Sequence, residues 1–306
     1  MVQMNDAVSG VADLLSAAAR EHPDKVALVE VDGRARTWAE LADEAGRLAH
    51  GLGAAGLVAG YRVVLAMGNG IEFVATYLGV LQAQLVAVPV NPRSTPDELE
   101  RMLTDSGARM VVADPTTVTA VRTAVARIEG PARPRVVVVG TTLQPGERSY
   151  DHLVATAGRP LPGLRDPESL AALLYTSGTS GRPRAAMLSH RALLANIEQV
   201  ASVEPQMIGA DDVVLGVLPL FHVYGLNAVL GQVVRQHGRL VLVDGFDPEG
   251  SLDIIEDEAI SVLPVAPPVF AYWMQVPGLE ERLGPVRMIL SGSAPLSPEL
   301  TEAFTE

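Results

Sequence analysis

The sequence predicts an α/β protein made of two doubly wound, mostly parallel sheets with helices on their faces. Short apolar runs that suit strands alternate with segments of helical spacing along all 306 residues. The runs are apolar throughout, as expected when helices cover both sides of a sheet. The length suggests two subdomains, which we expect at residues 1–168 and 169–306.

In the first half, the turn Asp32-Gly33 suits a hairpin between two short strands. A βαβ unit follows, and Thr95 with Glu98 forms a capping box for the next helix. Consecutive βαβ units favour right-handed crossovers and therefore a parallel sheet. The expected strands and helices of this region are RVVLAM, FVATYLGVLQA, LVAVPV, ELERMLTDSG, RMVVAD, VTAVRTAVARI and RVVVV.

The second half continues the alternation after a connecting stretch, 141–167, that is rich in Gly, Pro and charge. A helix from about Leu226 to Gln236 is expected between two of its strands. The other expected elements are DDVVLGVLPL, RLVLVD, SLDIIEDEA, SVLPVAPP, VFAYWMQV and VRMILSG.

Composition excludes several classes of protein. A formal charge of −13 argues against broad nucleic-acid or anionic-membrane binding, because both need a basic surface. The chain has no cysteine, which excludes disulfides, thiolate metal sites and a cysteine nucleophile. No apolar run reaches the roughly 18 residues of a membrane span, and the first residues do not resemble a signal peptide. We therefore expect a soluble cytoplasmic protein.

The rest of the chain is organised around the segment from Leu173 to His190, LLYTSGTSGRPRAAMLSH. An apolar strand breaks there into a loop of hydroxyl residues and glycine, which presents backbone N–H groups and hydroxyl donors without bulky side chains. Such a loop suits an anionic phosphate chain, and Arg184 adds a positive charge. An ordinary Gly/Ser turn is the alternative. Ser189 suits the N-cap of the next helix.

The segment YTSGTSGRPRAAMLSH resembles the phosphate-loop signature of the adenylate-forming superfamily, which includes acyl-CoA synthetases. The resemblance implies that the loop and Arg184 bind ATP and that Thr176 contacts Mg²⁺. This chain has Arg184-Ala185 where the family usually has Lys-Gly, and arginine is not equivalent to lysine at a phosphate contact. The implied ATP-binding loop residues are Thr176, Ser177, Gly178, Thr179, Ser180 and Gly181.

The segment PLFHVYG follows an expected strand, at the end where open α/β sheets bind their ligands. A lone histidine in apolar surroundings is more often a packed residue than a catalytic one. The segment is similar, however, to the family segment that approaches the carboxylate being activated, which implies a catalytic and substrate-binding role for His222. Tyr224, Gly225 and Val265 are the other expected substrate-binding residues. Core packing is the alternative for the pocket walls.

The segment SGSAPLS resembles the family segment that lies along the adenine ring. The resemblance adds Gly292, Ser293, Ala294 and Pro295 to the ATP-binding residues. Small side chains let a flat base approach the backbone closely. The same residues also suit a strand-to-helix joint, with Ser297 as the N-cap, and the two interpretations are compatible.

The resemblance implies the ATP- and acyl-binding N-terminal portion of an acyl-CoA synthetase-like ligase. The full reaction joins a fatty or aryl acid to ATP, giving an acyl-adenylate, and then to coenzyme A. Relatives continue past Glu306 into a C-terminal domain, which we expect to be absent here. The alternative is a non-catalytic nucleotide- or acyl-binding module. We also expect a homodimer through apolar surface near Leu300.

Overall fold

The computed structural model describes residues 8–158, 163–164, 166–176 and 184–305. The described residues divide into two compact units. The first unit is formed from Met1–Pro23, Trp38–Gly68 and Glu72–Ala195. The second unit is formed from Asp24–Thr37, Asn69–Ile71 and Asn196–Glu306.

The first unit contains a seven-stranded sheet in the order β7-β6-β5-β3-β4-β8-β9. Every neighbouring pair in it is parallel except β8 and β9, which form an antiparallel edge. The strands are β3 (Arg62–Ala66), β4 (Val86–Pro89), β5 (Met110–Ala113), β6 (Arg135–Val138), β7 (Arg148–Ser149), β8 (Leu170–Thr176) and β9 (Arg184–Ser189).

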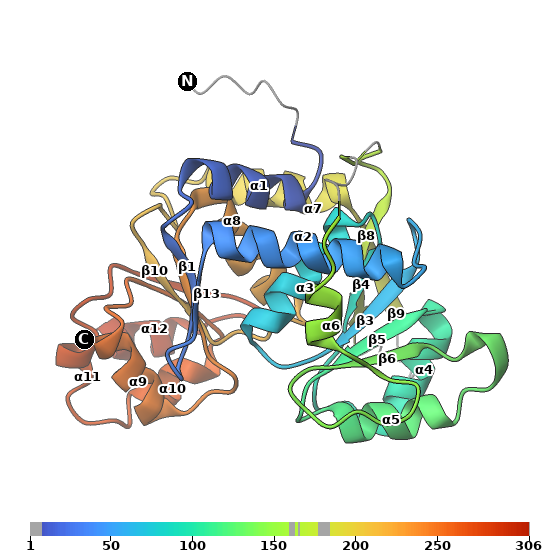
Figure 1. Ribbon diagram of the computed structural model, residues 1–306. Coiled ribbons are helices and arrows are strands. Elements are labelled where there is room, and N and C mark those ends of the chain that lie inside the picture. Colours follow the sequence, from blue (N-terminus) through green and yellow to red (C-terminus); the bar gives the residue numbers. More distant parts are fainter. Residues whose placement is uncertain (1–7, 159–162, 165, 177–183, 306) are drawn as a thin grey trace. The chain divides into compact units, whose positions relative to one another are not determined.

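Helices cover both faces of this sheet. On one face α4 and α5 pack over the strands (Figure 1). Leu99 and Val121 are buried there in one core with Val64 and Val111. On the other, α2 packs against α1 and α6. The helices are α1 (Val11–Glu21), α2 (Trp38–Ala54), α3 (Ile71–Gln82), α4 (Pro96–Ser106), α5 (Val118–Ala126), the 3₁₀ turn η1 (Gly130–Ala132), α6 (Tyr150–Val154) and α7 (His190–Ala201). The first residue of α3 and the second half of α7 are assigned to the second unit.

The second unit contains a six-stranded sheet in the order β13-β12-β10-β11-β1-β2. Its neighbouring strands are parallel except for β2, which pairs antiparallel with β1 through the hairpin at Gly33. The strands are β1 (Val26–Glu30), β2 (Ala35–Thr37), β10 (Val213–Gly216), β11 (Arg239–Leu242), β12 (Val262–Val265) and β13 (Met288–Ser291).

The helices of the second unit pack on this sheet around a core that includes Leu252, Ile255, Leu263 and Trp273. The chain leaves β10 for its neighbour β11 and then returns past β10 to β12. The carboxyl end of β10 is therefore a point where the strand order reverses. The helices are the π-helix η2 (Tyr224–Leu230), α8 (Gly231–Gln236), α9 (Pro248–Asp257), α10 (Pro268–Trp273), α11 (Leu279–Arg282) and α12 (Pro298–Thr305).

The expected fold class is confirmed, because two mostly parallel sheets carry flanking helices. The two compact units nevertheless differ from a division after residue 168. Strand β8 pairs with β4, and β9 pairs with β8, so both belong to the first unit. Strand β1 pairs with β11, and β2 pairs with β1, so both belong to the second. Hydrogen-bond partners far apart in the sequence set this membership. Among the described residues, no helix combines the length and the apolar character that a membrane crossing needs.

Candidate functional site

Three groups of residues expected to bind ligand lie at the carboxyl ends of three neighbouring parallel strands of the second unit. PLFHVYG follows β10, Val265 ends β12, and Gly292 comes directly after β13. The sheet order β13-β12-β10 brings their carboxyl ends to one edge. In open α/β sheets ligands bind in the crevice at this edge, beside a reversal of strand order.

The loop after β10 is fixed by its own backbone. The amide of His222 donates to the carbonyl of Pro219 at 3.1 Å. A Cβ atom on Gly225 would lie 2.4 Å from the same carbonyl oxygen, so this tight turn needs glycine. His222 is exposed. The turn therefore presents the imidazole ring to solvent instead of burying it in the core.

The imidazole of His222 has one nitrogen already occupied. Its Nδ1 accepts a hydrogen bond from the backbone N–H of Tyr224 at 3.3 Å. In a neutral ring the proton then lies on Nε2, because one nitrogen must accept while the other donates. The ring can offer an Nε2–H donor to an anionic ligand such as a carboxylate.

The ring of Tyr224 packs on the backbone of Gly292. A Cβ atom on Gly292 would lie 2.6 Å from Cε1 of Tyr224, and the tyrosine hydroxyl donates to the carbonyl of Leu290 at 3.2 Å. Burial raises the pKa of Tyr224 to about 12, so the phenol stays protonated and keeps this bond at neutral pH. The segment expected to bind the acid and the segment expected to face adenine thus meet through these residues.

The segment after β13 continues the same edge. The amide of Gly292 donates to the carbonyl of Val265 at 3.2 Å, which links the ends of β12 and β13. Ser293 has a φ of 69°, a left-handed conformation that costs energy for a residue with a Cβ atom. Ala294 and Pro295 are exposed. The side chain of Val265 is fully buried in the core, so its expected role in substrate binding remains a prediction.

The helical wall beside this loop departs from the single helix expected at 226–236. The chain forms the π-helix η2 and only then the α-helix α8. Buried amides join this wall to α7: Asn227 Nδ2 donates to Asn196 Oδ1 at 2.8 Å, and Gln232 donates to the carbonyl of Ile197. The wider turn of a π-helix is frequently found at functional sites.

The phosphate loop lies mostly outside the described residues. Ser177, Gly178, Thr179, Ser180 and Gly181 are not described, whereas Thr176 ends β8 and Arg184 begins β9. The two residues are register partners and both are exposed; the Thr176 hydroxyl donates to the Arg184 carbonyl at 3.3 Å. Their roles with phosphate and Mg²⁺ remain predictions.

Two neighbouring residues hold these strand ends in place. The hydroxyl of Tyr175 donates to Asp105 of α4 at 2.7 Å, and burial raises its pKa above the usual tyrosine value. Ala185 lies in the regular pairing of β9 with β8, and its methyl group packs against the core. Strand geometry suits alanine, so the missing glycine at 185 does not disturb this part of the loop's exit.

The sequence did not predict a role for Asn69, either in binding a ligand or in the fold. Its side chain bonds the ends of β10 and β11 and the start of the His222 loop. The available signal was an asparagine between two glycines directly after a strand, which by itself indicates only a turn.

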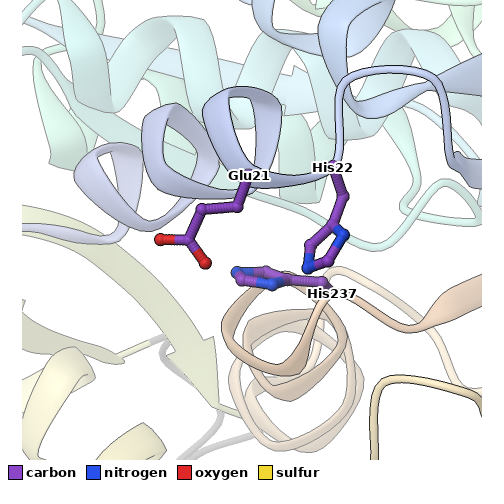
Figure 2. A group of neighbouring side chains, drawn as sticks. All are labelled: Glu21, His22 and His237. Atoms are coloured by element: carbon purple, nitrogen blue, oxygen red, sulfur yellow. The ribbon is translucent and has the colours of Figure 1, made fainter. Parts of the chain in front are cut away.

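Figure 2 draws Glu21 and His22, which close α1 in the first unit, and His237, which ends α8 in the second. His237 adopts a left-handed φ of 60° as the helix C-cap. Because these side chains come from separate units, we assign them no metal site. Within either unit taken alone, the described residues bring no group of three potential metal ligands together.

Comparison with known proteins gives a consistent result for the whole chain. Residues 15–306 match the family described as AMP-binding enzyme. The 4-coumarate–CoA ligase-like 9 of Oryza sativa subsp. japonica is 32% identical over 305 residues, covering 96% of this chain and 54% of that protein. The 4-coumarate–CoA ligase 5 of the same plant is 34% identical, covering 84% and 47%. The chain spans about half the length of these curated relatives.

Solved structures share the fold. The N-terminal domain of FACL13 from Mycobacterium tuberculosis superposes with a TM-score of 0.86 at 24% identity, over 97% of this chain and 73% of that one. ATP-bound MatB from Rhodopseudomonas palustris gives 0.82 at 30% identity, over 96% and 57%. At 24% identity, the similarity to FACL13 shows the fold alone. MatB was solved with ATP bound.

Proposed function

Because this chain belongs to the AMP-binding enzyme family, we propose that it is the ATP- and acid-binding part of an acyl- or aryl-CoA ligase. The proposed reaction joins a fatty or aryl carboxylate to the α-phosphate of ATP and releases pyrophosphate. Coenzyme A then accepts the acyl group in the complete ligase. The convergence of the His222 loop, Val265 and Gly292 at one sheet edge is the observation that carries this proposal.

In this proposal His222 orients the acid. A carboxylate and a polyphosphate repel each other, so the acid must be held by a donor that adds no negative charge. The Nε2–H of His222 is such a donor, because the Tyr224 amide fixes the other ring nitrogen. A carboxylate oxygen attacks phosphorus, the bond from phosphorus to the bridging oxygen breaks, and pyrophosphate leaves with the bonding pair.

Two groups of residues are proposed to contact ATP. Gly292 and Ser293 allow a flat base to approach the backbone, since the first has no side chain and the second carries a small one. Arg184 supplies an exposed guanidinium for the phosphates. Mg²⁺ prefers oxygen ligands and takes part of its shell from phosphates. Thr176 could supply one such oxygen, because its hydroxyl donates its hydrogen to the backbone carbonyl of Arg184 and its oxygen lone pairs can still coordinate a cation.

The acid is proposed to be fatty or aryl, and 4-coumarate belongs in the test because relatives at 32% and 34% identity carry that name. The test is carboxylate-dependent exchange of labelled pyrophosphate into ATP by the 306-residue chain with Mg²⁺. The panel contains 4-coumarate, benzoate, malonate, a medium-chain fatty acid and an amino acid. We expect an aryl or fatty acid to give the highest exchange rate.

A matched pair of variants makes the test specific. His222→Ala should abolish exchange, whereas His152→Ala removes another exposed histidine, in α6 of the first unit, and should leave it unchanged. Equal exchange by both variants would contradict the proposed role of His222.

A non-catalytic binding module is the second proposal, and Arg184-Ala185 in place of the family's Lys-Gly favours it. Calorimetric binding of ATP and acid without any exchange would support this module. If the chain bound neither ATP nor any acid, both proposals would fail.

A further inference from the structure

Asn69 makes four hydrogen bonds with backbone groups of the second unit. Its Nδ2 lies 3.1 Å from the carbonyl of Gly216, 2.9 Å from that of Leu218 and 3.2 Å from that of Val243. Its Oδ1 accepts from the amide of Leu220 at 2.9 Å. One primary amide thus uses both its donor and its acceptor on main-chain groups.

These partners lie where regular pairing of two strands stops. Gly216 is the last residue of β10, and Val243 follows the last residue of the neighbouring strand β11. The carbonyl of Gly216 still accepts from the amide of Val243 at 3.2 Å, and beyond this bond the backbone groups need other partners. Asn69 therefore joins the carboxyl ends of two parallel strands.

The same side chain fixes the start of the loop that presents His222. Leu218 and Leu220 flank Pro219, whose carbonyl accepts the amide of His222 at 3.1 Å. Holding the residues on both sides of Pro219 fixes the direction of that carbonyl. Asn69 is thus linked to His222 through its bonds to Leu218 and Leu220 and through the carbonyl of Pro219 between them.

We propose that Asn69 is a positioning residue that sets the orientation of His222 for the acid through the backbone of residues 218–220. The expected effect on acid binding rests on the proposed function. The role of Asn69 in holding the His222 loop does not depend on it. Positioning groups matter because small displacements of a reacting group reduce rates steeply. Asn69 itself touches no ligand in this proposal.

The chemistry of the amide explains the residue type. Aspartate has nearly the same shape and keeps the acceptor for Leu220, but it directs a carboxylate at three carbonyl oxygens. Alanine removes both functions. The series of asparagine, aspartate and alanine therefore separates the donor function of this side chain from its acceptor function.

The first measurement is amide hydrogen exchange by NMR on the 306-residue chain. In Asn69→Ala we expect the amides of Leu220 and His222 to exchange about tenfold faster, the effect of losing a typical hydrogen bond. In Asn69→Asp the Leu220 amide keeps its acceptor, so it should exchange more slowly than in Asn69→Ala. Unchanged exchange of both amides in Asn69→Ala would overturn the proposal.

The control variant is Ser261→Ala, which loses a comparable hydrogen bond at the other end of the same sheet. The Ser261 hydroxyl accepts from the Val213 amide at 3.0 Å, at the start of β10. We expect Ser261→Ala to leave the Leu220 and His222 amides unchanged. If it accelerated them as much as Asn69→Ala does, the effect would be general destabilisation and the positioning role would be refuted.

The second measurement is calorimetric binding of the most active acid of the panel, and separately of ATP. We expect Asn69→Ala to weaken acid binding about tenfold and to leave ATP binding nearly unchanged. An equal loss for both ligands would refute the specific link to His222. If the wild-type chain binds no acid, the proposed function fails, while the exchange of Leu220 and His222 still decides whether Asn69 holds the loop.

Discussion

The ring of Tyr224 lies so close to the backbone of Gly292 that a Cβ atom there would approach its Cε1 and Cζ to 2.6 and 2.7 Å. Real Cβ atoms do not tolerate such contacts, so any side chain at position 292 must displace the ring. Displacement would also break the bond from the Tyr224 hydroxyl to the Leu290 carbonyl. Close packing by these two residues fixes the edge at which adenine and acid are proposed to bind.

We predict that Gly292→Ala lowers the free energy of unfolding by about 1–3 kcal/mol, because overpacking forces side chains off their rotamers. Urea denaturation measures this loss. In a Tyr224→Ala background the added methyl group meets no ring, so the same change should cost much less.

Gly53→Ala is the control for this prediction. Gly53 is exposed in α2, and an added Cβ atom there meets nothing within 4 Å. Gly53 lies in the last turn of α2, so in that variant the free energy of unfolding should stay the same or rise by less than about 1 kcal/mol, because a helix favours alanine over glycine. An equal loss from Gly292→Ala in both tyrosine backgrounds would contradict the packing argument.

Gln84 adopts a φ of 57° at the end of α3, where helices usually place glycine. Its amide donates to Leu81, and the amide of Leu85 donates to Val80, the two bonds of a Schellman motif. We predict that Gln84→Gly raises the free energy of unfolding by about 0.5–1 kcal/mol, because the left-handed strain outweighs the added entropy of the unfolded chain.

The comparison variant is Gln82→Gly, two residues earlier in the chain. Gln82 is the last residue of α3 and has an ordinary helical backbone, so glycine there should cost about 0.5–1 kcal/mol. Thermal unfolding of both variants gives the comparison. Destabilisation by both changes would mean that the side chain of Gln84 outweighs its strained backbone.

Local signals predicted much of this structure correctly. Thr95 caps α4 together with Glu98, and Ser189 accepts from the amide of Ala192 at the start of α7, as their sequence patterns indicate. The hairpin at Gly33 forms as expected. These features depend on residues three or four positions apart, so side-chain chemistry and spacing are enough to predict them.

Features that depend on distant partners could not be predicted from one sequence. Leu28 of β1 pairs with Leu240 of β11, and nothing local marks either residue as the partner of the other. The four bonds of Asn69 likewise reach residues at or just beyond the carboxyl ends of β10 and β11. Motif resemblance indicated His222 and Gly292, but only the strand order shows that they lie at one edge.

Asp212 links the amino ends of several strands in the second unit. It is buried and accepts hydrogen bonds from Arg287 Nε at 2.7 Å, from the Ser261 hydroxyl at 2.8 Å and from the Gly209 amide at 2.6 Å. Burial acts to raise the pKa of Asp212, but these bonds outweigh it, Arg287 foremost, and the pKa is lowered overall.

A lowered pKa in the folded state stabilises the fold above the unfolded pKa of about 3.9, and this contribution disappears as pH falls through the folded value. We predict that Asp212→Asn lowers the free energy of unfolding by about 2 kcal/mol at pH 7. The difference in free energy of unfolding between Asp212→Asn and wild type should shrink below about pH 4. Urea titrations from pH 3 to pH 7 measure it.

Asp97→Asn provides the matched control, since Asp97 pairs with Arg127 while its side chain is 68% exposed. Solvent screens such a pair, so this variant should change little at any pH. A constant difference between Asp212→Asn and wild type across the titration would show that packing, and not the carboxylate charge, explains the loss.

Arg184 is an exposed cation at the start of β9, beside Thr176. If its guanidinium contacts the phosphates of ATP, Arg184→Ala should weaken ATP binding about tenfold or more, because a charge-assisted contact contributes about 1.5–3 kcal/mol. Arg184→Lys keeps the charge and restores the family's residue, so it should retain most of the affinity. The fraction of the affinity that Arg184→Lys retains shows how far the forked donors of arginine matter for ATP binding.

The control is Arg148→Ala, which removes an exposed arginine from β7, at the opposite edge of the same sheet, and should leave ATP binding unchanged. Calorimetry at low and at physiological salt separates a direct contact from general electrostatic attraction. If net charge alone caused the loss of ATP affinity, Arg148→Ala would lose as much affinity as Arg184→Ala. Both losses would then disappear as the salt concentration increases.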